Sequence, residues 1–190
     1  MAMPVTTQPC LRHSTPVILL LLMVPATTCT CNHRHALDTT FSWDSLELLR
    51  TMAPSPTEAC QHQWAPILPS ALLRNSHPQQ AATIAFRILQ KVFTIFSSLG
   101  TPQHWDARAQ DAFLNHLHHH IHHLEQCLPA KSMLSKRKTP RNLQLSIDKY
   151  FASIQDFLHT HNHSTCAWDH VRLQARACFQ HMDMLIRQMK

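Results

Sequence analysis

The sequence predicts an all-α fold, in which one domain is built as a bundle of five helices. Three observations lead to this prediction. The chain has 190 residues, of which 44% are apolar, so a single domain with a sizeable core is expected. Its only glycine is Gly100, which disfavours tight β-hairpins and excludes glycine-rich phosphate-binding loops. Five segments also carry apolar residues at the three-to-four-residue spacing of an amphipathic helix.

The N-terminal segment is predicted to be an export signal rather than part of the bundle. A basic residue, Arg12, precedes an unbroken apolar run over residues 17–24, and small residues follow. This order is typical of a secretory signal peptide, and the run is too short to span a bilayer. We therefore expect residues 1–30 to be a signal peptide cleaved before Cys31, which leaves one mature domain at 31–190. An ordinary buried N-terminal helix is the alternative.

The first two helices are expected on either side of a long connection. The first covers residues 40–52, where Phe41 begins an apolar face. Five prolines then punctuate residues 53–78, a connection long enough to cross over the fold. The second helix is expected over residues 79–99, and its apolar residues, Leu99 included, cover more than half of its circumference. Such a wide stripe predicts the most central helix of the bundle.

The third helix is expected to open at Thr101 and Pro102, a capping residue followed by a first-turn proline, and to end before Pro129. The fourth covers residues 142–160, and the fifth begins near Thr165. Long connections between helices of this length are typical of up-up-down-down bundles. We therefore predict a five-helix up-up-down-down bundle with a long crossover loop.

Cysteine usage predicts disulfides. Removal of the signal peptide leaves five cysteines, and an exported protein meets an oxidising environment. Two disulfides and one leftover cysteine are therefore expected, and the spacing does not determine the pairing. No Cys-x-x-Cys motif is present, which disfavours a zinc ribbon or a redox site. The five residues are Cys31, Cys60, Cys127, Cys166 and Cys178.

A histidine cluster at residues 116–123 is the most prominent local motif. On a helix its histidines avoid the apolar stripe, and the pairs His116/His120 and His119/His123 have the four-residue spacing of a metal chelate. No His-Glu-x-x-His motif accompanies them, so we expect neither a functional metal site nor a cofactor. The preferred interpretation is a solvated face that gains charge near pH 6, with adventitious metal binding as the alternative.

The fifth helix carries a candidate partner-binding surface. Seven residues share the face opposite its apolar stripe, and one leucine lies between two arginines. An apolar side chain beside positive charge has the composition of a binding patch, but an ordinary solvated face explains the pattern equally well. The seven residues are Asp169, Arg172, Leu173, Arg176, Gln180, Asp183 and Arg187.

Charge and local motifs narrow the function classes further. The formal net charge is +6, but only residues 136–138 form a basic run, which indicates a solvated loop more than a nucleic-acid-binding stripe. Contact with acidic glycans or with an acidic receptor surface is the alternative for this run. No nucleophile-and-base motif is apparent, so we expect no enzyme. Asn162 begins an Asn-x-Ser sequon between the fourth and fifth helices, and we expect glycosylation there.

Short motifs spread along residues 31–190 carry a family resemblance. The most specific is Cys166-Ala167-Trp168-Asp169-His170-Val171-Arg172. Others are Cys31-Asn32-His33, Asp44-Ser45-Leu46, Met52-Ala53-Pro54, His104-Trp105-Asp106, Leu124-Glu125-Gln126-Cys127 and Lys149-Tyr150-Phe151. Together these motifs resemble a type I interferon, most of all the beta-like branch of the bird interferons.

The resemblance implies a cytokine bundle with disulfides Cys31–Cys127 and Cys60–Cys166, and with Cys178 free. It also implies a secreted antiviral protein that joins the two different chains of a type I interferon receptor and triggers Janus kinase/STAT signalling. A monomer or weak dimer is expected, with neither nucleic-acid binding nor membrane insertion. The alternative function is a secreted histidine-rich protein that binds metal or glycans.

The resemblance also places the receptor contacts, position by position. In the last helix they fall on Arg172, Leu173, Arg176 and Gln180, and in the first helix on Leu46 and Arg50. The crossover loop has Trp64 where mammalian members have an arginine, so we expect an apolar substitute formed by Trp64, Ile67 and Leu68. Asp148 replaces a basic residue of the mammalian second-receptor site.

Overall fold

The computed structural model describes residues 40–53, 68, 78–128 and 141–188, and within these ranges the chain forms five α-helices and no β-strand. The helices are α2 (Phe41–Met52), α3 (Pro78–Phe96), α4 (Ala107–Cys127), α6 (Arg141–Thr160) and α7 (Thr165–Gln188). The predicted all-α, five-helix fold is confirmed. The predicted signal peptide (1–30), Cys31, Cys60, Trp64 and Ile67 lie outside the described residues.

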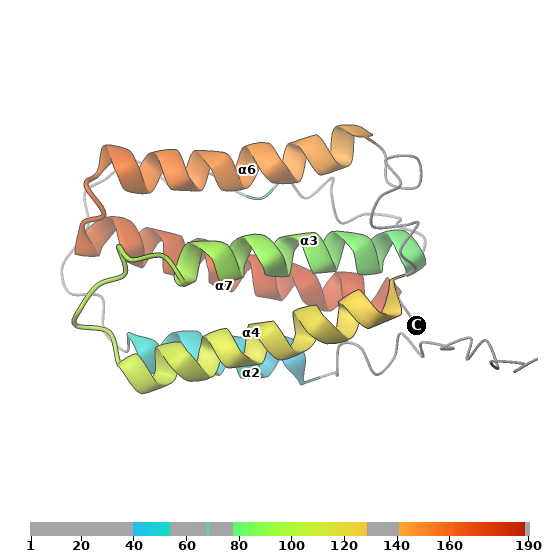
Figure 1. Cartoon of the computed structure of the whole chain (residues 1–190), viewed down its shortest axis with the longest axis horizontal. Coiled ribbons are helices and arrows are strands. Elements are labelled where there is room, and N and C mark those ends of the chain that lie inside the picture. Colours follow the sequence, from blue (N-terminus) through green and yellow to red (C-terminus); the bar gives the residue numbers. More distant parts are fainter. Residues whose placement is uncertain (1–39, 54–67, 69–77, 129–140, 189–190) are drawn as a thin grey trace, which may run out of the picture.

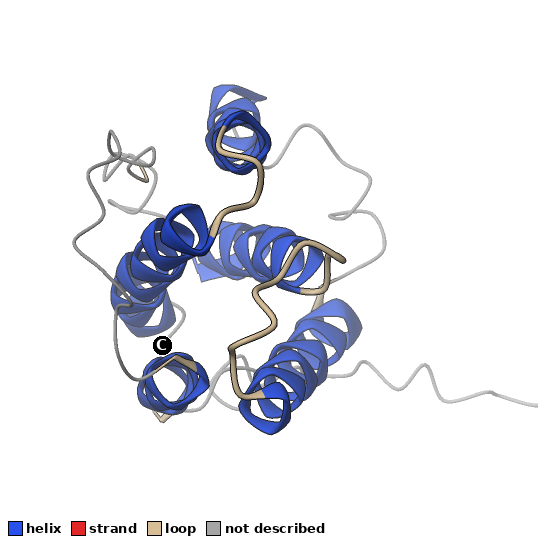
Figure 2. Cartoon of the chain, turned by 90° about the vertical axis from the view of Figure 1, so that its left-hand side faces the viewer, coloured by secondary structure: helices blue, strands red, loops and turns tan. Residues whose placement is uncertain are grey.

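Four of the helices form the up-up-down-down bundle, and α6 is added to its outside. Figure 1 shows α2 and α3 running in one direction and α4 and α7 in the opposite direction. In the end-on view of Figure 2, α6 lies at the top, apart from the other four helices. Helix α2 packs against α4 and α7, and α3 packs against the same two helices. The short α2 therefore lies between α4 and α7, which both run antiparallel to it.

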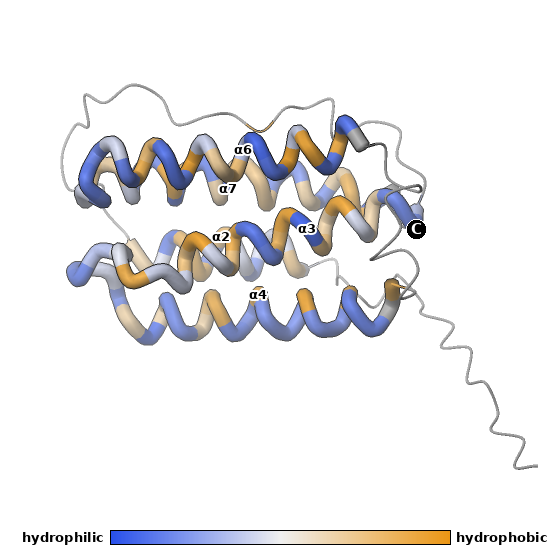
Figure 3. Tube along the Cα trace, turned by 45° about the horizontal axis from the view of Figure 1, so that its top comes forward, coloured by the Kyte–Doolittle hydropathy of each residue, from blue (hydrophilic) through white to orange (hydrophobic). Residues whose placement is uncertain are grey.

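A continuous apolar core fills the space between the helices. Ten of the 19 residues of α3 are buried, which agrees with the prediction that this helix is the most central. In Figure 3 the hydrophobic positions recur along each helix at intervals of about one turn. Burial of these stripes is the main favourable contribution to folding, because the apolar side chains leave water together.

A chain of aromatic rings runs through the core and links four helices. Phe41 of α2 meets Phe179 of α7, and Phe179 meets Phe113 of α4, with ring centroids 5.8 Å apart in both pairs. Phe113 meets Phe96 of α3 edge-on at 5.2 Å. Phe96 in turn lies 5.9 Å from Trp168. Edge-to-face pairs of this kind add about 0.5–1.5 kcal/mol each beyond the burial of apolar area.

Two predicted helix boundaries between α3 and α4 were wrong. Helix α3 ends at Phe96 instead of residue 99, because the amide of Ser98 bonds the carbonyl of Ile95 in a tighter turn. Leu99, predicted as part of the apolar stripe, is consequently fully exposed. Helix α4 begins at Ala107, well after the predicted cap at Thr101.

Asp106 is the residue that caps α4. Its carboxylate accepts a hydrogen bond from the amide of Ala109 at 2.8 Å, and its own amide donates to the carbonyl of Met52 at the end of α2. The delayed start of α4 lets Trp105 turn inward, where it is 4% exposed. The turn at Gly100, which precedes Trp105, packs on the α6–α7 connection, since a Cβ added at Gly100 would lie 2.7 Å from Nδ1 of His163.

The histidines at the α2–α4 contact are less exposed than predicted. His116 and His120 are half-buried and pack on the ring of Phe41, at centroid distances of 5.1 and 4.6 Å. Burial lowers the pKa of His116, outweighing the Phe41 backbone and Asp44, which raise it, while His119 lowers it further. The predicted solvated face is therefore wrong for these two histidines, because α2 covers them.

The cysteines are described only in part. Cys178, which the resemblance left unpaired, is free and buried in α7, with Sγ 3.5 Å from the hydroxyl of Tyr150. Burial raises the pKa of its thiol to about 11. Cys166 is disulfide-bonded. The predicted pairing is not tested, because Cys31 and Cys60 lie outside the described residues and only the backbone of Cys127 is described, at the end of α4.

Removal of the α4 cap should destabilise the bundle. The Asp106→Ala substitution leaves the amide of Ala109 without its acceptor, so we expect the free energy of unfolding to fall by about 1 kcal/mol in urea titrations. Asp106→Asn retains a capping acceptor and should stay close to the wild type. Asp111→Ala, an exposed change within the same helix, is the control. Equal stability of all four proteins would contradict the role of the cap.

Packing of His116 should make stability depend on pH. Its folded pKa lies below that of the unfolded chain, so the unfolded state binds a proton first as pH falls through about 6.5. Stability is therefore full above this range and decreases on acidification from pH 7.5 to 5.5. Urea titrations should show a smaller decrease for His116→Gln, whereas His104→Gln, in the exposed connection before α4, should behave as wild type. Identical pH profiles for all three would refute this assignment.

Candidate functional site

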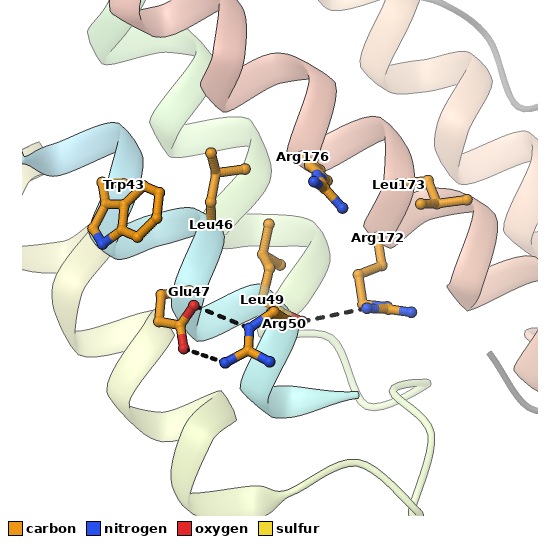
Figure 4. A pocket seen from close by; sticks show the side chains of 8 residues that line it. All are labelled: Trp43, Leu46, Glu47, Leu49, Arg50, Arg172, Leu173 and Arg176. Atoms are coloured by element: carbon orange, nitrogen blue, oxygen red, sulfur yellow. Dashed lines mark hydrogen bonds and ion pairs between the residues drawn. The ribbon is translucent and has the colours of Figure 1, made fainter. Parts of the chain in front are cut away.

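A surface groove of about 180 Å³ lies between α2 and α7, and it is the candidate functional site (Figure 4). Two helix faces form it. Counted from Trp43, the α2 residues lie at i, i+3, i+4, i+6 and i+7, and α7 adds three residues within two turns. The lining residues are Trp43, Leu46, Glu47, Leu49, Arg50, Arg172, Leu173 and Arg176. We call this the α2–α7 groove.

Sequence reasoning missed three of the lining residues, Trp43, Glu47 and Leu49, of which Trp43 is the large exposed apolar one. Its side chain is 70% exposed, unusual for so large an apolar group, and Leu173 across the groove is 52% exposed. Figure 4 shows Leu46 between Trp43 and the α7 residues. The signal was present in the sequence, because Trp43 lies three and seven residues before Leu46 and Arg50, which were already assigned to this surface.

Arg50 and Glu47 form a bidentate ion pair at one edge of the groove. The guanidinium donates to both carboxylate oxygens, at 2.6 and 3.0 Å. This hydrogen-bonded guanidinium holds the pKa of the Glu47 carboxyl below its ordinary value. Both side chains are largely exposed, so the pair adds little to the free energy of unfolding.

Arg172 is held more firmly, and one prediction about its neighbour was wrong. Asp169, predicted on the exposed face, is 4% exposed. Its Oδ1 lies 3.5 Å from Nη2 of Arg172. Nη1 of Arg172 donates to the carbonyl of Leu49 in the last turn of α2, also at 3.5 Å. The guanidinium therefore bridges the two helices that form the groove.

The structure brings together most of the residues that the resemblance assigned to receptor contact. Leu46 and Arg50 of α2 lie in one groove with three of the α7 residues, Arg172, Leu173 and Arg176. Gln180 is exposed one turn further along α7 but does not line the groove. Leu68 was wrongly included, because it is 3% exposed and packed into the core, where a partner cannot contact it.

A second groove, of about 450 Å³, lies among α3, α4 and α6. Beside it Nζ of Lys91 lies 3.1 Å from the carboxylate of Asp148, the residue that departs from the mammalian pattern. The ion pair satisfies both charges locally. The lining residues are Arg87, Gln90, Lys91, Phe93, Thr94, Ile95, His118, Ile121, Phe151 and Gln155.

The histidines of α4 do not gather into a group of three metal ligands with other described residues. No group of three or more potential ligands is close enough to hold a metal ion anywhere in the part of the chain that the structure describes. The rings of His119 and His123, one predicted chelating pair, lie 6.4 Å apart between centroids.

Among the residues that the structure describes, no helix is both long and apolar enough to cross a bilayer.

Comparisons with known proteins identify the family. The model of the interferon alpha/beta domain matches residues 35–189. Interferon type B of Gallus gallus is 50% identical over 94% of this chain and 91% of its own length, and Interferon type A1/A2 of the same species is 42% identical over 97% of each. Zebrafish interferon 2 has a similar fold, with a TM-score of 0.68 over 77% of this chain and 97% of that one at 18% identity. The chain therefore belongs to the interferon alpha/beta family and is an antiviral cytokine, not an enzyme.

Proposed function

We propose that this interferon is secreted and acts by joining the two different chains of its cell-surface receptor, one at each groove. The observation that carries the proposal is the α2–α7 groove, where Trp43 and Leu173 expose apolar area beside arginines. Aromatic, aliphatic and arginine side chains together are the composition of energetically important interface centres. The high-affinity receptor chain occupies this groove.

The second receptor chain binds the α3–α4–α6 groove. Members of the family signal through a two-chain receptor, so a second surface is needed. This groove lies on helices that do not form the first one, which leaves room for both receptor chains on one molecule. Bringing the chains together activates their Janus kinases and STAT transcription factors, and this produces the antiviral state.

Export and processing complete the proposal. Residues 1–30 act as a signal peptide, and the mature chain carries disulfides Cys31–Cys127 and Cys60–Cys166. Asn162 is exposed in the connection between α6 and α7, with φ of 50°, and this exposure supports glycosylation at its sequon. The mature protein works as a monomer or weak dimer.

Substitution in each groove should separate the two receptor contacts. Arg176→Glu should weaken binding to one receptor ectodomain and spare the other, and Arg87→Glu should show the opposite selectivity, because each reverses a charge in a single groove. Both should reduce protection of responsive cells against virus. Arg108→Glu, exposed on α4 outside both grooves, is the control. Surface plasmon resonance showing the same ectodomain affected by both variants would disprove the two-groove arrangement.

Metal removal tests the alternative of a histidine-rich metal-binding protein. We expect protein treated with a chelator to keep its full antiviral potency and helicity, since the described histidines do not form a three-ligand site. Circular dichroism and a virus-protection assay measure the two quantities. Loss of potency on chelation, with recovery on adding Zn²⁺, would favour the metal-binding function instead.

A further inference from the structure

The arginines that line the α2–α7 groove are not equivalent in charge. Arg50 is neutralised by Glu47 at 2.6 Å, and Arg172 faces Asp169 at 3.5 Å. Among the residues that the structure describes, Arg176 makes no ion pair. An incoming partner therefore meets one uncompensated positive charge, although three guanidinium groups line the groove.

Arg172 is placed for a role inside the molecule. Its side chain is only 13% exposed, and the carboxylate that orients it is 6% exposed. The carbonyl of Leu49 that it contacts belongs to the last turn of α2, where carbonyls lack partners within the helix and a positive charge is favourable. The Arg172–Asp169 pair thus fastens the end of α2 to α7 and leaves little of its charge for a partner.

Arg176 differs from Arg172 in both exposure and charge pairing. It is exposed, and Figure 4 shows it facing the groove beside Leu46, with Trp43 on one side and Leu173 on the other. Trp43 and Leu173 are the two most exposed apolar side chains of the groove. The contact surface is therefore a single guanidinium flanked by two apolar groups.

We propose that the α2–α7 groove binds a receptor segment in which one carboxylate is flanked by apolar side chains. The carboxylate pairs with Arg176, the apolar groups cover Trp43 and Leu173, and Arg172 is a positioning residue that holds α2 against α7. This inference rests on the proposed receptor-binding function and names the chemistry of the partner at that site.

The charge pattern favours a protein partner over a sulfated glycan. A polyanionic chain gains affinity from several uncompensated cations in a row, and its binding falls steeply with salt. The groove offers one such cation between apolar surfaces, which matches the apolar centre and few charges of a protein interface.

Neutral substitutions of two arginines test the assignment of charge. Binding of each purified receptor ectodomain is measured at 50 and 500 mM salt for Arg176→Gln and for its matched control, Arg108→Gln, which removes an exposed arginine of α4 that lines neither groove. Arg176→Gln should weaken the binding of one ectodomain about tenfold or more at low salt and flatten the salt dependence. Arg108→Gln should change affinity by about twofold or less, because its side chain lies outside both grooves. Equal effects of the two variants would overturn the assignment.

Truncation of the flanking apolar side chains tests the apolar part of the proposed contact. Trp43→Ala and Leu173→Ala should each weaken binding of the same ectodomain about tenfold or more, with little change in the salt dependence. Leu145→Ala, which removes a leucine of similar exposure (50%) on α6, is the control and should bind as wild type. Unchanged affinity for both groove variants would refute the apolar contact.

The positioning role of Arg172 needs a readout that contact loss alone would not change. Arg172→Gln and Asp169→Asn should both speed hydrogen exchange of the α2 amides and weaken binding by similar factors at both salt concentrations. Arg176→Gln should leave α2 exchange unchanged. If Arg172→Gln instead flattens the salt dependence and leaves exchange unchanged, Arg172 is a contact residue and the proposal fails.

Two further outcomes separate this inference from the proposed function. If the wild-type protein binds neither ectodomain, the receptor function itself is wrong. If it binds, and Arg176→Gln reduces retention on immobilised heparin but not receptor affinity, the groove binds a glycan and this inference alone is wrong.

Discussion

The docking of α2 between α4 and α7 is the constraint on which the candidate site depends. A helix of 12 residues is marginal in isolation, so its place is set by tertiary contacts. Phe41 anchors its first turn among the rings of His116, His120 and Phe179. At the other end, the amide of Asp106 satisfies the carbonyl of Met52. The groove exists only where this short helix lies beside α7, so the capping contacts and the candidate site share one structural origin.

Much of the fold followed from apolar periodicity. The boundaries of α2 and α6 and the start of α7 were predicted to within one residue, because prolines or polar turns delimit their stripes. The region between α3 and α4 was the exception. Thr101 and Pro102 have the composition of a helix start, but burial of Trp105 draws the chain inward first and moves the cap to Asp106. Local pattern could not predict this, since the competing contact is tertiary.

The residues of the candidate site were also predicted in part from the sequence. A helical wheel placed Leu173 and Arg176 on the surface, and the resemblance added Leu46 and Arg50, which the structure gathers into the same groove. The wheel could not show that Asp169 is buried, because burial depends on the segments packed on a helix and a wheel treats each helix alone. For the same reason the wheel did not reveal the contact between the α4 histidines and Phe41, because Phe41 lies on another helix, 75 positions before His116 in the sequence.

The burial of Cys178 has a consequence for how the chain matures. An odd thiol in an oxidising compartment threatens correct bridging, because a thiolate attacks existing disulfides and exchanges partners. With a pKa of about 11, roughly one Cys178 thiol in ten thousand is ionised at pH 7, and the side chain is 1% exposed. Once the bundle has formed, the Cys178 sulfur can neither exchange with the other cysteines nor crosslink two molecules, so the folded core itself protects the covalent pattern of the chain.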